Sequence, residues 1–421
     1  MFRSLRLFNY RIWFIGALIS NIGTWMQRTA QDWLVYDILT EQDAAAMGIV
    51  MALQMGPQLL MAPWAGLVAD RFDRQKLLMA TQISMAVLGL ALGLMVIADV
   101  AQLWHVYAFA LALGMVTAVD APARQTFVSD LVRDDYLPNA VALNSTSFNL
   151  ARMIGPAIAG VLTVAVGPGP VFLINAATFA AMIAALLAIR RQELHPRQKV
   201  AKGRGQIREG FRYVKDRPDL VVVMTAIFII GTFGLNFSVF VASMARTEFG
   251  GHAGDFGVLS SVMAAGSVTG SLLSARRERP RLRYIFGASV AFGVACTAAG
   301  LAPSVCLFGL ALVPVGAAAI TIMTSANAYV QTTTDPMMRG RVMSLYMAIL
   351  MGGTPLGAPL VGLVSNSFGP RWGLGVAALS GVAAAAVGIL WAWRAHHMRL
   401  RFDRSAPRKL SITYGVPDRP A

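Results

Sequence analysis

Charged residues and cysteines are scarce in this chain of 421 residues. Asp, Glu, Lys and Arg make up only 14% of the sequence, whereas soluble domains carry about 25%. The two cysteines and five histidines have neither the spacing of a zinc site nor that of a disulfide framework. We therefore expect no metal and no cofactor, and the low charge content favours a membrane protein.

Motifs of catalysis and of nucleotide hydrolysis are also missing. The chain contains no H-E-x-x-H, no G-x-S-x-G and no P-loop sequence. We therefore do not expect an enzyme, and without a P-loop this chain has no direct use for ATP. We also expect no cleavable leader, because the first apolar stretch is too long for a signal peptide.

Apolar residues, by contrast, make up 56% of the chain. They form twelve runs of the length that a membrane helix needs, about 20 residues. The sequence therefore predicts an all-α membrane protein with twelve transmembrane helices. We place the spans at 12–37, 44–69, 77–98, 104–123, 139–166, 170–189, 220–246, 256–275, 284–302, 304–330, 342–367 and 370–393.

Positive charge falls almost entirely on one side of these spans. With the N-terminus inside and the spans alternating, 32 of the 36 Lys and Arg residues lie on inner segments. Such a distribution follows the positive-inside rule. It predicts that both termini are cytoplasmic, and it explains the net charge of +15 without any nucleic acid.

A basic segment in the middle of the chain separates two sets of six spans. It becomes amphipathic at Ile207, Phe211 and Val214, which is typical of a helix on the membrane surface or of a plain solvated helix. Similar segments 200 residues apart, beginning at Asp135 and Asp335, indicate two pseudo-symmetric halves. We predict a six-helix bundle over 1–189, a linker over 190–219, a second bundle over 220–394 and a basic cytoplasmic tail over 395–421.

The loop between the second and third spans carries a recognisable motif. Residues 66–76 read G-L-V-A-D-R-F-D-R-Q-K, which resembles the major facilitator superfamily (MFS) signature G-x-x-x-D-R-x-G-R-[RK]. The resemblance implies a transporter with its site between the halves and a charged cytoplasmic gate, in which Arg124 is the expected partner of Asp70. The gating residues are Gly66, Asp70, Arg71, Arg74, Asp120 and Arg124.

Further segments narrow this resemblance. Residues 20–27, 120–125 and 339–344 resemble the branch of enterobactin exporters and transmembrane secretion effectors. In span five, Gly155, Pro156 and Gly160 fit an exporter pattern in which a kinked helix packs closely against its neighbours. These resemblances imply efflux from a bacterial cytoplasm across the inner membrane.

Three charged side chains are predicted to lie within the membrane. Each costs about 2.5–3.5 kcal/mol at a helix centre, so each is a candidate for function. Arg28 and Asp32 share a face of span one and can pair, either as a proton-exchanging pair or as a static one; Arg152 of span five is expected to attract an anionic group. The predicted substrate-binding residues are Asn21, Trp25, Arg28, Asp32, Asn144, Phe148, Arg152, Asn236 and Asn327.

Taken together, these features predict a secondary transporter. We expect proton-driven efflux of amphipathic or anionic small molecules, of the drug or siderophore type, by alternating access. A proton-coupled uptake symporter or a lysolipid flippase of the same fold are the alternatives. The expected partners are the substrate, protons and membrane lipids, with no nucleic acid, and we expect a monomer.

Overall fold

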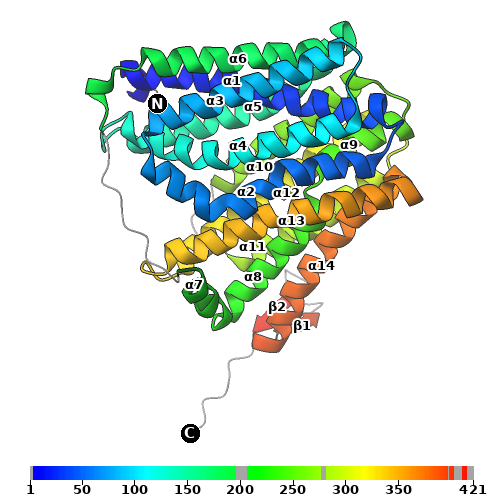
Figure 1. Cartoon of the computed structure of the whole chain (residues 1–421). Coiled ribbons are helices and arrows are strands. Elements are labelled where there is room, and N and C mark those ends of the chain that lie inside the picture. The colour runs from blue at the N-terminus through cyan, green and yellow to red at the C-terminus, as the bar shows by residue number, and fades with distance from the viewer. Residues whose placement is uncertain (1–2, 196–205, 276–280, 397, 403–409, 415–421) are drawn as a thin grey trace.

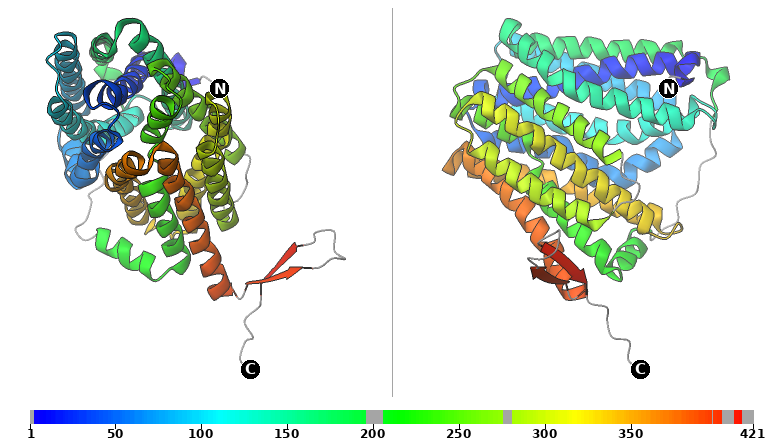
Figure 2. Two further views of the ribbon diagram at one scale, coloured as in Figure 1. Left: turned by 90° about the vertical axis from the view of Figure 1, so that its right-hand side faces the viewer. Right: turned by 180° about the vertical axis from the view of Figure 1, so that it is seen from behind.

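The computed structural model describes residues 3–195, 206–275, 281–396, 398–402 and 410–414. These residues form a bundle of long helices in which the N-terminal and C-terminal halves lie side by side (Figures 1 and 2). The first half contains α1 (Phe8–Trp33) with its π-helical continuation η2 (Leu34–Leu39), α2 (Ala44–Arg71), α3 (Arg74–Ile97), α4 (Leu103–Asp130), α5 (Leu137–Val166) and α6 (Pro168–Ala188).

The second half follows the linker helix α7 (Gln206–Lys215). Its first span is divided into α8 (Pro218–Ile229), the π-helical η4 (Ile230–Gly234), α9 (Phe237–Ser243) and the π-helical η5 (Met244–Glu248). The remaining helices are α10 (Ala253–Ala275), α11 (Leu282–Gly300), α12 (Val305–Thr333), α13 (Arg339–Phe368) and α14 (Pro370–His396).

Eleven of these spans are long and apolar enough to cross a membrane by length and composition alone. The twelfth is α1, whose hydropathy is lowered by polar residues such as Gln27, Arg28 and Asp32. It packs between α5 and α6 in the interior of the first half, so it is a span like the others. The chain is thus an all-α membrane protein with twelve spans in two six-helix halves.

The two halves repeat the same internal packing. The pairs α2–α4, α3–α6 and α1–α5 of the first half correspond to α10–α12, α11–α14 and η4–α13 of the second. The connection before the last helix of each half repeats as well. Gly167, with φ of +80°, precedes Pro168 at the start of α6, and Gly369, with φ of +97°, precedes Pro370 at the start of α14. Glycine tolerates this left-handed backbone, and proline suits the first turn of a helix.

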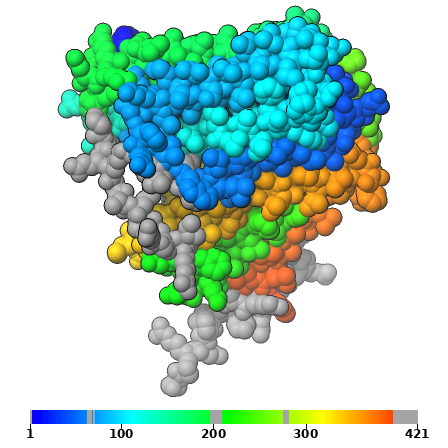
Figure 3. Space-filling view, in the orientation of Figure 1, coloured from blue at the N-terminus to red at the C-terminus, as the bar shows by residue number. Residues whose placement is uncertain are grey.

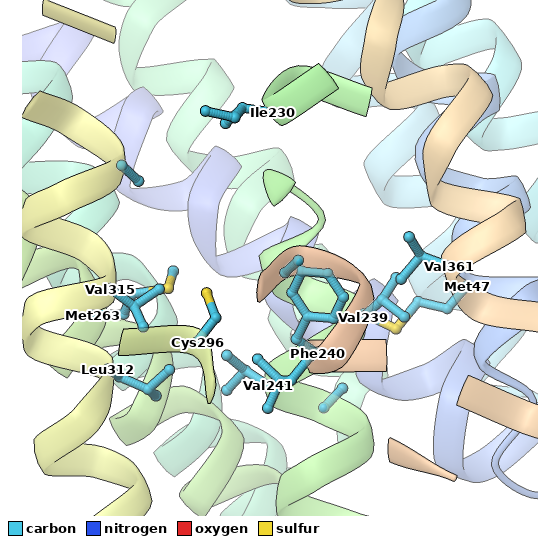
Figure 4. Packing of buried hydrophobic residues seen from close by; sticks show 14 of the residues in the cluster. Met47, Ile230, Val239, Phe240, Val241, Met263, Cys296, Leu312, Val315 and Val361 are labelled. Atoms are coloured by element: carbon cyan, nitrogen blue, oxygen red, sulfur yellow. The ribbon is translucent and has the colours of Figure 1, made fainter. Parts of the chain in front are cut away.

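The halves meet through α2 against α13 and α5 against α10. In Figure 3 the blue surface of α2 lies directly against the orange surface of α13. Met47 of α2 and Val361 of α13 are fully buried where the halves meet (Figure 4). The same apolar cluster continues into the second half through Phe240, Met263 and Leu312.

Close approaches between the halves concentrate toward one end of the bundle. We call the end with the loops 71–74, 130–137 and 333–339 the linker end, and the other the opposite end. A Cβ added to Gly160 of α5 would lie 2.9 Å from the carbonyl oxygen of Ala253, at the start of α10. Gly362 of α13 likewise faces the backbone of Ala44, at the start of α2. The halves are therefore packed backbone to backbone at the opposite end.

The linker helix packs on the second half rather than standing apart. Glu209 forms an ion pair with Arg341 of α13, and Val214 is buried. Phe211 is 61% exposed, and the side chain of Ile207 lies outside the described residues. At its C-terminal end, a hydrogen bond from the Arg217 guanidinium to Asp219 raises the pKa of Arg217.

The C-terminal tail differs from the prediction in one respect. Helix α14 continues to His396, and two short strands follow, β1 (Met398–Phe402) and β2 (Leu410–Tyr414). They pair antiparallel, with Met398 opposite Tyr414. The rest of the predicted tail, and residues 196–205 of the linker, lie outside the described residues.

Candidate functional site

A polar stripe on α1 ends at the junction between the two halves. Its members are Asn21, Trp25 and Arg28, which are half-buried, and Asp32, which is buried. Directly after Asp32, Trp33 stacks on Phe256 of α10, with ring centroids 6.0 Å apart. Because this contact joins the halves, the end of the stripe at Asp32 lies at their junction.

Four of the predicted binding residues meet around one ring. The guanidinium carbon of Arg28 lies 5.4 Å from the centroid of Trp25, and that of Arg152 lies 5.8 Å from it. Phe148 meets the same ring edge-on, with centroids 5.8 Å apart. We call these four residues, contributed by α1 and α5, the Trp25 cluster.

Neither arginine of the cluster is neutralised by a close carboxylate. Among the described residues, no acidic oxygen forms an ion pair within 4.0 Å of either guanidinium, and the Nε of Arg28 is buried without a hydrogen-bond partner. Asp32 attracts Arg28 only from a longer distance, so the two do not form the direct ion pair that their spacing allows. The Trp25 cluster therefore holds two positive charges that lack a close counter-ion.

The repulsion between these charges has a lower limit. Because the two guanidinium carbons lie 5.4 and 5.8 Å from the same ring centroid, they are at most about 11 Å apart. At an effective dielectric constant of about 20, two unit charges at that separation repel by about 1.5 kcal/mol. An anion placed between Arg28 and Arg152 would turn this repulsion into attraction.

The seventh span is broken beside Asp32. Leu235 and Asn236 leave the helix between η4 and α9, whereas the sequence predicted an unbroken span over 220–246. Ser238, in the first turn of α9, lies near the Asp32 carboxylate. Because Ser238 comes two residues after the break, the polar backbone of the second half lies near Asp32. Broken and π-helical segments are common where transporters bind substrates and ions.

None of the four predicted asparagines is hydrogen-bonded to the Trp25 cluster among the described residues. Asn236 is fully buried; its Nδ2 donates to the carbonyl of Thr232 at 2.7 Å, and its Oδ1 has no partner. Asn327 is hydrogen-bonded within its own helix, nearer the linker end. No hydrogen bond among the described residues joins these two, Asn21 or Asn144 to the cluster.

Charged side chains at the linker end join helices within the first half. Arg74 donates to both carboxylate oxygens of Asp130, at 2.7 and 2.6 Å, and both side chains are mostly buried. Arg71 is exposed. The side chain of Asp70 and the surroundings of Gly66 lie outside the described residues.

Asp120 is the centre of a second buried network. It accepts hydrogen bonds from Thr81 at 2.6 Å, from Gln82 at 2.9 Å and from the Nε of Arg124 at 3.0 Å. Arg124 is therefore engaged by Asp120 on its own helix; its expected pairing with Asp70 involves a side chain outside the described residues. Both networks join α3 to α4, so they fix helices within one half.

Glycines in span five set how closely other helices approach it. A Cβ on Gly155 would lie 2.6 Å from the Cβ of Trp25, so α1 crosses α5 directly behind the Trp25 cluster. Further along, the carbonyl of Pro156 and the backbone of Gly160 face Gly257 of α10. One end of this motif thus positions the cluster, and the other joins the halves.

A polar latch closes the opposite end. Its members pair across the halves as Asp37–Arg246, Tyr36–Thr247 and Asp43–Asn366. The Nε of Arg246 donates to Asp37 at 2.5 Å, the hydroxyls of Tyr36 and Thr247 are 2.6 Å apart, and Asn366 donates to Asp43 at 2.7 Å. The sequence analysis did not find this latch, although Arg246 is one of the four Lys and Arg residues that lie outside the inner segments.

The described residues contain no group of three or more His, Cys, Asp or Glu side chains placed to hold a metal ion. Cys296 is buried and Cys306 is exposed, and both are free. The chemistry of the site therefore rests on the Trp25 cluster and Asp32.

Comparison with known proteins agrees with this architecture. The model of the transmembrane secretion effector family matches residues 2–406. The staphyloferrin A transporter of Staphylococcus aureus is 26% identical over 85% of this chain and 90% of its own length. Macrolide efflux protein A of Streptococcus pyogenes is 22% identical over 86% of this chain and 90% of its own length.

A solved structure shows the same fold. A bacterial homologue of the human lysosomal transporter Spinster, in an inward-facing and occupied conformation, superposes with a TM-score of 0.73 at 17% identity, covering 92% of this chain and 96% of the other. The fold and the family match both describe a transporter and not an enzyme. The chain belongs to the transmembrane secretion effector family of the major facilitator superfamily.

Proposed function

We propose that this protein exports small amphipathic or anionic molecules from a bacterial cytoplasm, driven by the proton gradient. The observation that carries the proposal is the place of three charges: Arg28, Asp32 and Arg152 lie within α1 and α5, and none of them forms an ion pair within 4.0 Å among the described residues. They come from two helices of the first half that border the second half. A site between two halves is what alternating access requires.

The orientation rests on the charge distribution. The segments of the linker end carry nearly all the Lys and Arg residues, so we assign this end to the cytoplasm. The polar latch then lies on the outer side and is closed. In this conformation the site would exchange substrate with the cytoplasm, which is the loading step of an exporter.

Asp32 is the proposed proton carrier. It is 6% exposed, and its neighbours include Arg28 on its own helix and Ser238 on the other half. When the halves move, the Ser238 contact changes, and with it the stability of the carboxylate. Proton binding at Asp32 would thereby be linked to the conformation.

For an anionic cargo, the membrane potential acts in the same direction as export. A negative interior expels anions with about 2.3 kcal/mol per charge for each 100 mV. The macrolide and staphyloferrin relatives are consistent with a cargo of the drug or siderophore type, since their names describe such molecules.

Everted vesicles test the proposal. Vesicles that contain the protein and pump protons inward should accumulate compounds from a panel of siderophores, macrolides and dyes, and collapse of the gradient should stop accumulation. Asp32→Asn should lose gradient-driven accumulation, whereas Asp99→Asn, at an exposed loop position, should retain it. Full activity of Asp32→Asn, or accumulation that ignores the gradient, would contradict the proposal.

Proton-coupled uptake is a second candidate, and one observation favours it. Arg28 attracts Asp32, so an anion bound to Arg28 would compete with that carboxylate and favour its protonation. Proton and anion would then bind together, as in a symporter. In the vesicle assay this mechanism predicts accumulation under a proton gradient of the opposite sense.

A further inference from the structure

We infer that the Trp25 cluster is a binding site for an organic oxyanion, a molecule with a carboxylate or similar group attached to a flat or apolar body. This inference rests on the proposed function and names the cargo class of the same site. It is carried by the two guanidinium groups around one ring, at 5.4 and 5.8 Å, and by the buried Nε of Arg28 that has no partner.

The charge balance of the membrane interior points the same way. Two arginines and one aspartate leave a net charge of +1 at the site, and the spans of the second half add no charge at this depth. Buried charges are usually paired or bind a ligand. Asp32 attracts Arg28, but among the described residues it is not in ion-pair contact with either arginine.

The geometry of the donors suits an oxyanion. A guanidinium group presents several N–H donors in a plane and recognises carboxylate, sulfonate or phosphate groups by paired hydrogen bonds. Arg28 and Arg152 come from different helices, α1 and α5, so a ligand held by both would be fixed between them. A cation at the same place would meet two like charges, and this arrangement therefore selects against cationic cargo.

The aromatic residues Trp25 and Phe148 supply the apolar part of the site. Phe148 is 48% exposed and lies edge-on to Trp25, which is itself half-buried. Their exposed parts give an apolar body a surface to pack against. The oxyanion and the apolar body would thus be recognised by adjacent groups of one cluster.

The test measures binding directly, with isophthalate as the probe. Purified full-length protein in detergent is unfolded by heat at constant ionic strength, with isophthalate or with its neutral analogue isophthalamide. We expect isophthalate to raise the midpoint of unfolding in a saturable manner, and isophthalamide to have little effect. Arg28→Gln and Arg152→Gln should each weaken the apparent affinity by at least about tenfold, the usual loss for a charged hydrogen bond.

Two further variants keep the test sharp. Arg11→Gln removes an exposed arginine of the same helix and should bind as the unchanged protein does. Arg152→Lys keeps the positive charge and should keep part of the affinity, even if Arg152→Gln fails to fold. Absence of any isophthalate effect on the unchanged protein, or equal binding by Arg152→Gln, would overturn the inference.

Transport separates this inference from the proposed function. Gradient-driven export of rhodamine 123, a cationic dye, together with the absence of any isophthalate effect would leave the exporter standing and would overturn the oxyanion site. Specific isophthalate binding without transport of any compound would support the oxyanion site and contradict the proposed export function.

Discussion

Replacing Asn366 with alanine should loosen the polar latch without touching the membrane interior. The Asn366 amide donates to Asp43 at 2.7 Å and accepts from the backbone N–H of Ala44 at 2.9 Å. Asp43 keeps its hydrogen bonds to the backbone of Ala45 and Ala46 in the variant, so the start of α2 stays capped. The change therefore removes only bonds that cross between the halves.

The expected magnitude follows from these two bonds. Each contributes about 0.5–1.5 kcal/mol net, and because Asn366 is exposed we use the lower part of this range, about 1–2 kcal/mol in total. Alternating access requires a second state in which the opposite end opens. Loss of about 1–2 kcal/mol would raise the ratio of that state to the closed one by about 5- to 30-fold. A minor population of about 1% would become roughly 5–20%.

Distances between spin labels can measure this shift. Cysteines at Val100 and Leu301 carry the labels; both positions are exposed, on the α3–α4 and α11–α12 loops at the opposite end. Cys296 and Cys306 are replaced beforehand. Asn366→Ala should add or enlarge a longer-distance population.

Asn149→Ala serves as the control for this measurement, because the Asn149 amide is hydrogen-bonded within its own helix. It should leave the distance distribution unchanged. Identical distributions in Asn366→Ala and in the unchanged protein would refute the role of the latch.

Two further predictions concern stability. Arg74→Gln should destabilise the protein by about 3–5 kcal/mol because it leaves the mostly buried carboxylate of Asp130 unpaired; thermal unfolding should show this, and a variant that also carries Asp130→Leu should regain part of the loss. Gly155→Leu should lower stability by about 1–3 kcal/mol or displace Trp25, since its Cβ would lie 2.6 Å from that of Trp25. An unchanged melting temperature together with unchanged isophthalate binding would show that α1 and α5 do not cross so closely.

Much of the architecture could be predicted from the sequence, because it depends on local chemistry. Runs of apolar residues of fixed length give the spans in their correct order, and the amphipathic segment around Val214 is a helix in the structure. The stripe from Asn21 to Asp32 follows from helical spacing alone. These features need no knowledge of which helices are neighbours.

The features that the sequence did not reveal depend on contacts between distant segments. The seventh span breaks at Asn236 without a proline, and the Asn236 side chain compensates by donating to the carbonyl of Thr232. Asp120 and Arg124 lie one helical turn apart on α4, but only the packing of α3 on α4 shows that Thr81 and Gln82 also donate to the Asp120 carboxylate. Propensity and periodicity carry no information about such choices.

The latch shows the same limit. Asp37 and Arg246 are 209 residues apart, and each belongs to a π-helical end of a span that the sequence indicates only as an apolar run. Their pairing depends on how the halves meet. Hydropathy also ranks α1 below the other spans, because the charges that make it a candidate site lower its apolar character.

The most direct test of the account is the side from which the polar stripe can be reached. Asn21→Cys, in a protein without Cys296 and Cys306, places one thiol on the half-buried face of α1. A membrane-impermeant thiol reagent should label it readily in everted vesicles, where the cytoplasmic face is outside, and poorly in right-side-out vesicles. Labelling only in right-side-out vesicles would contradict a site that opens at the linker end beneath a closed latch.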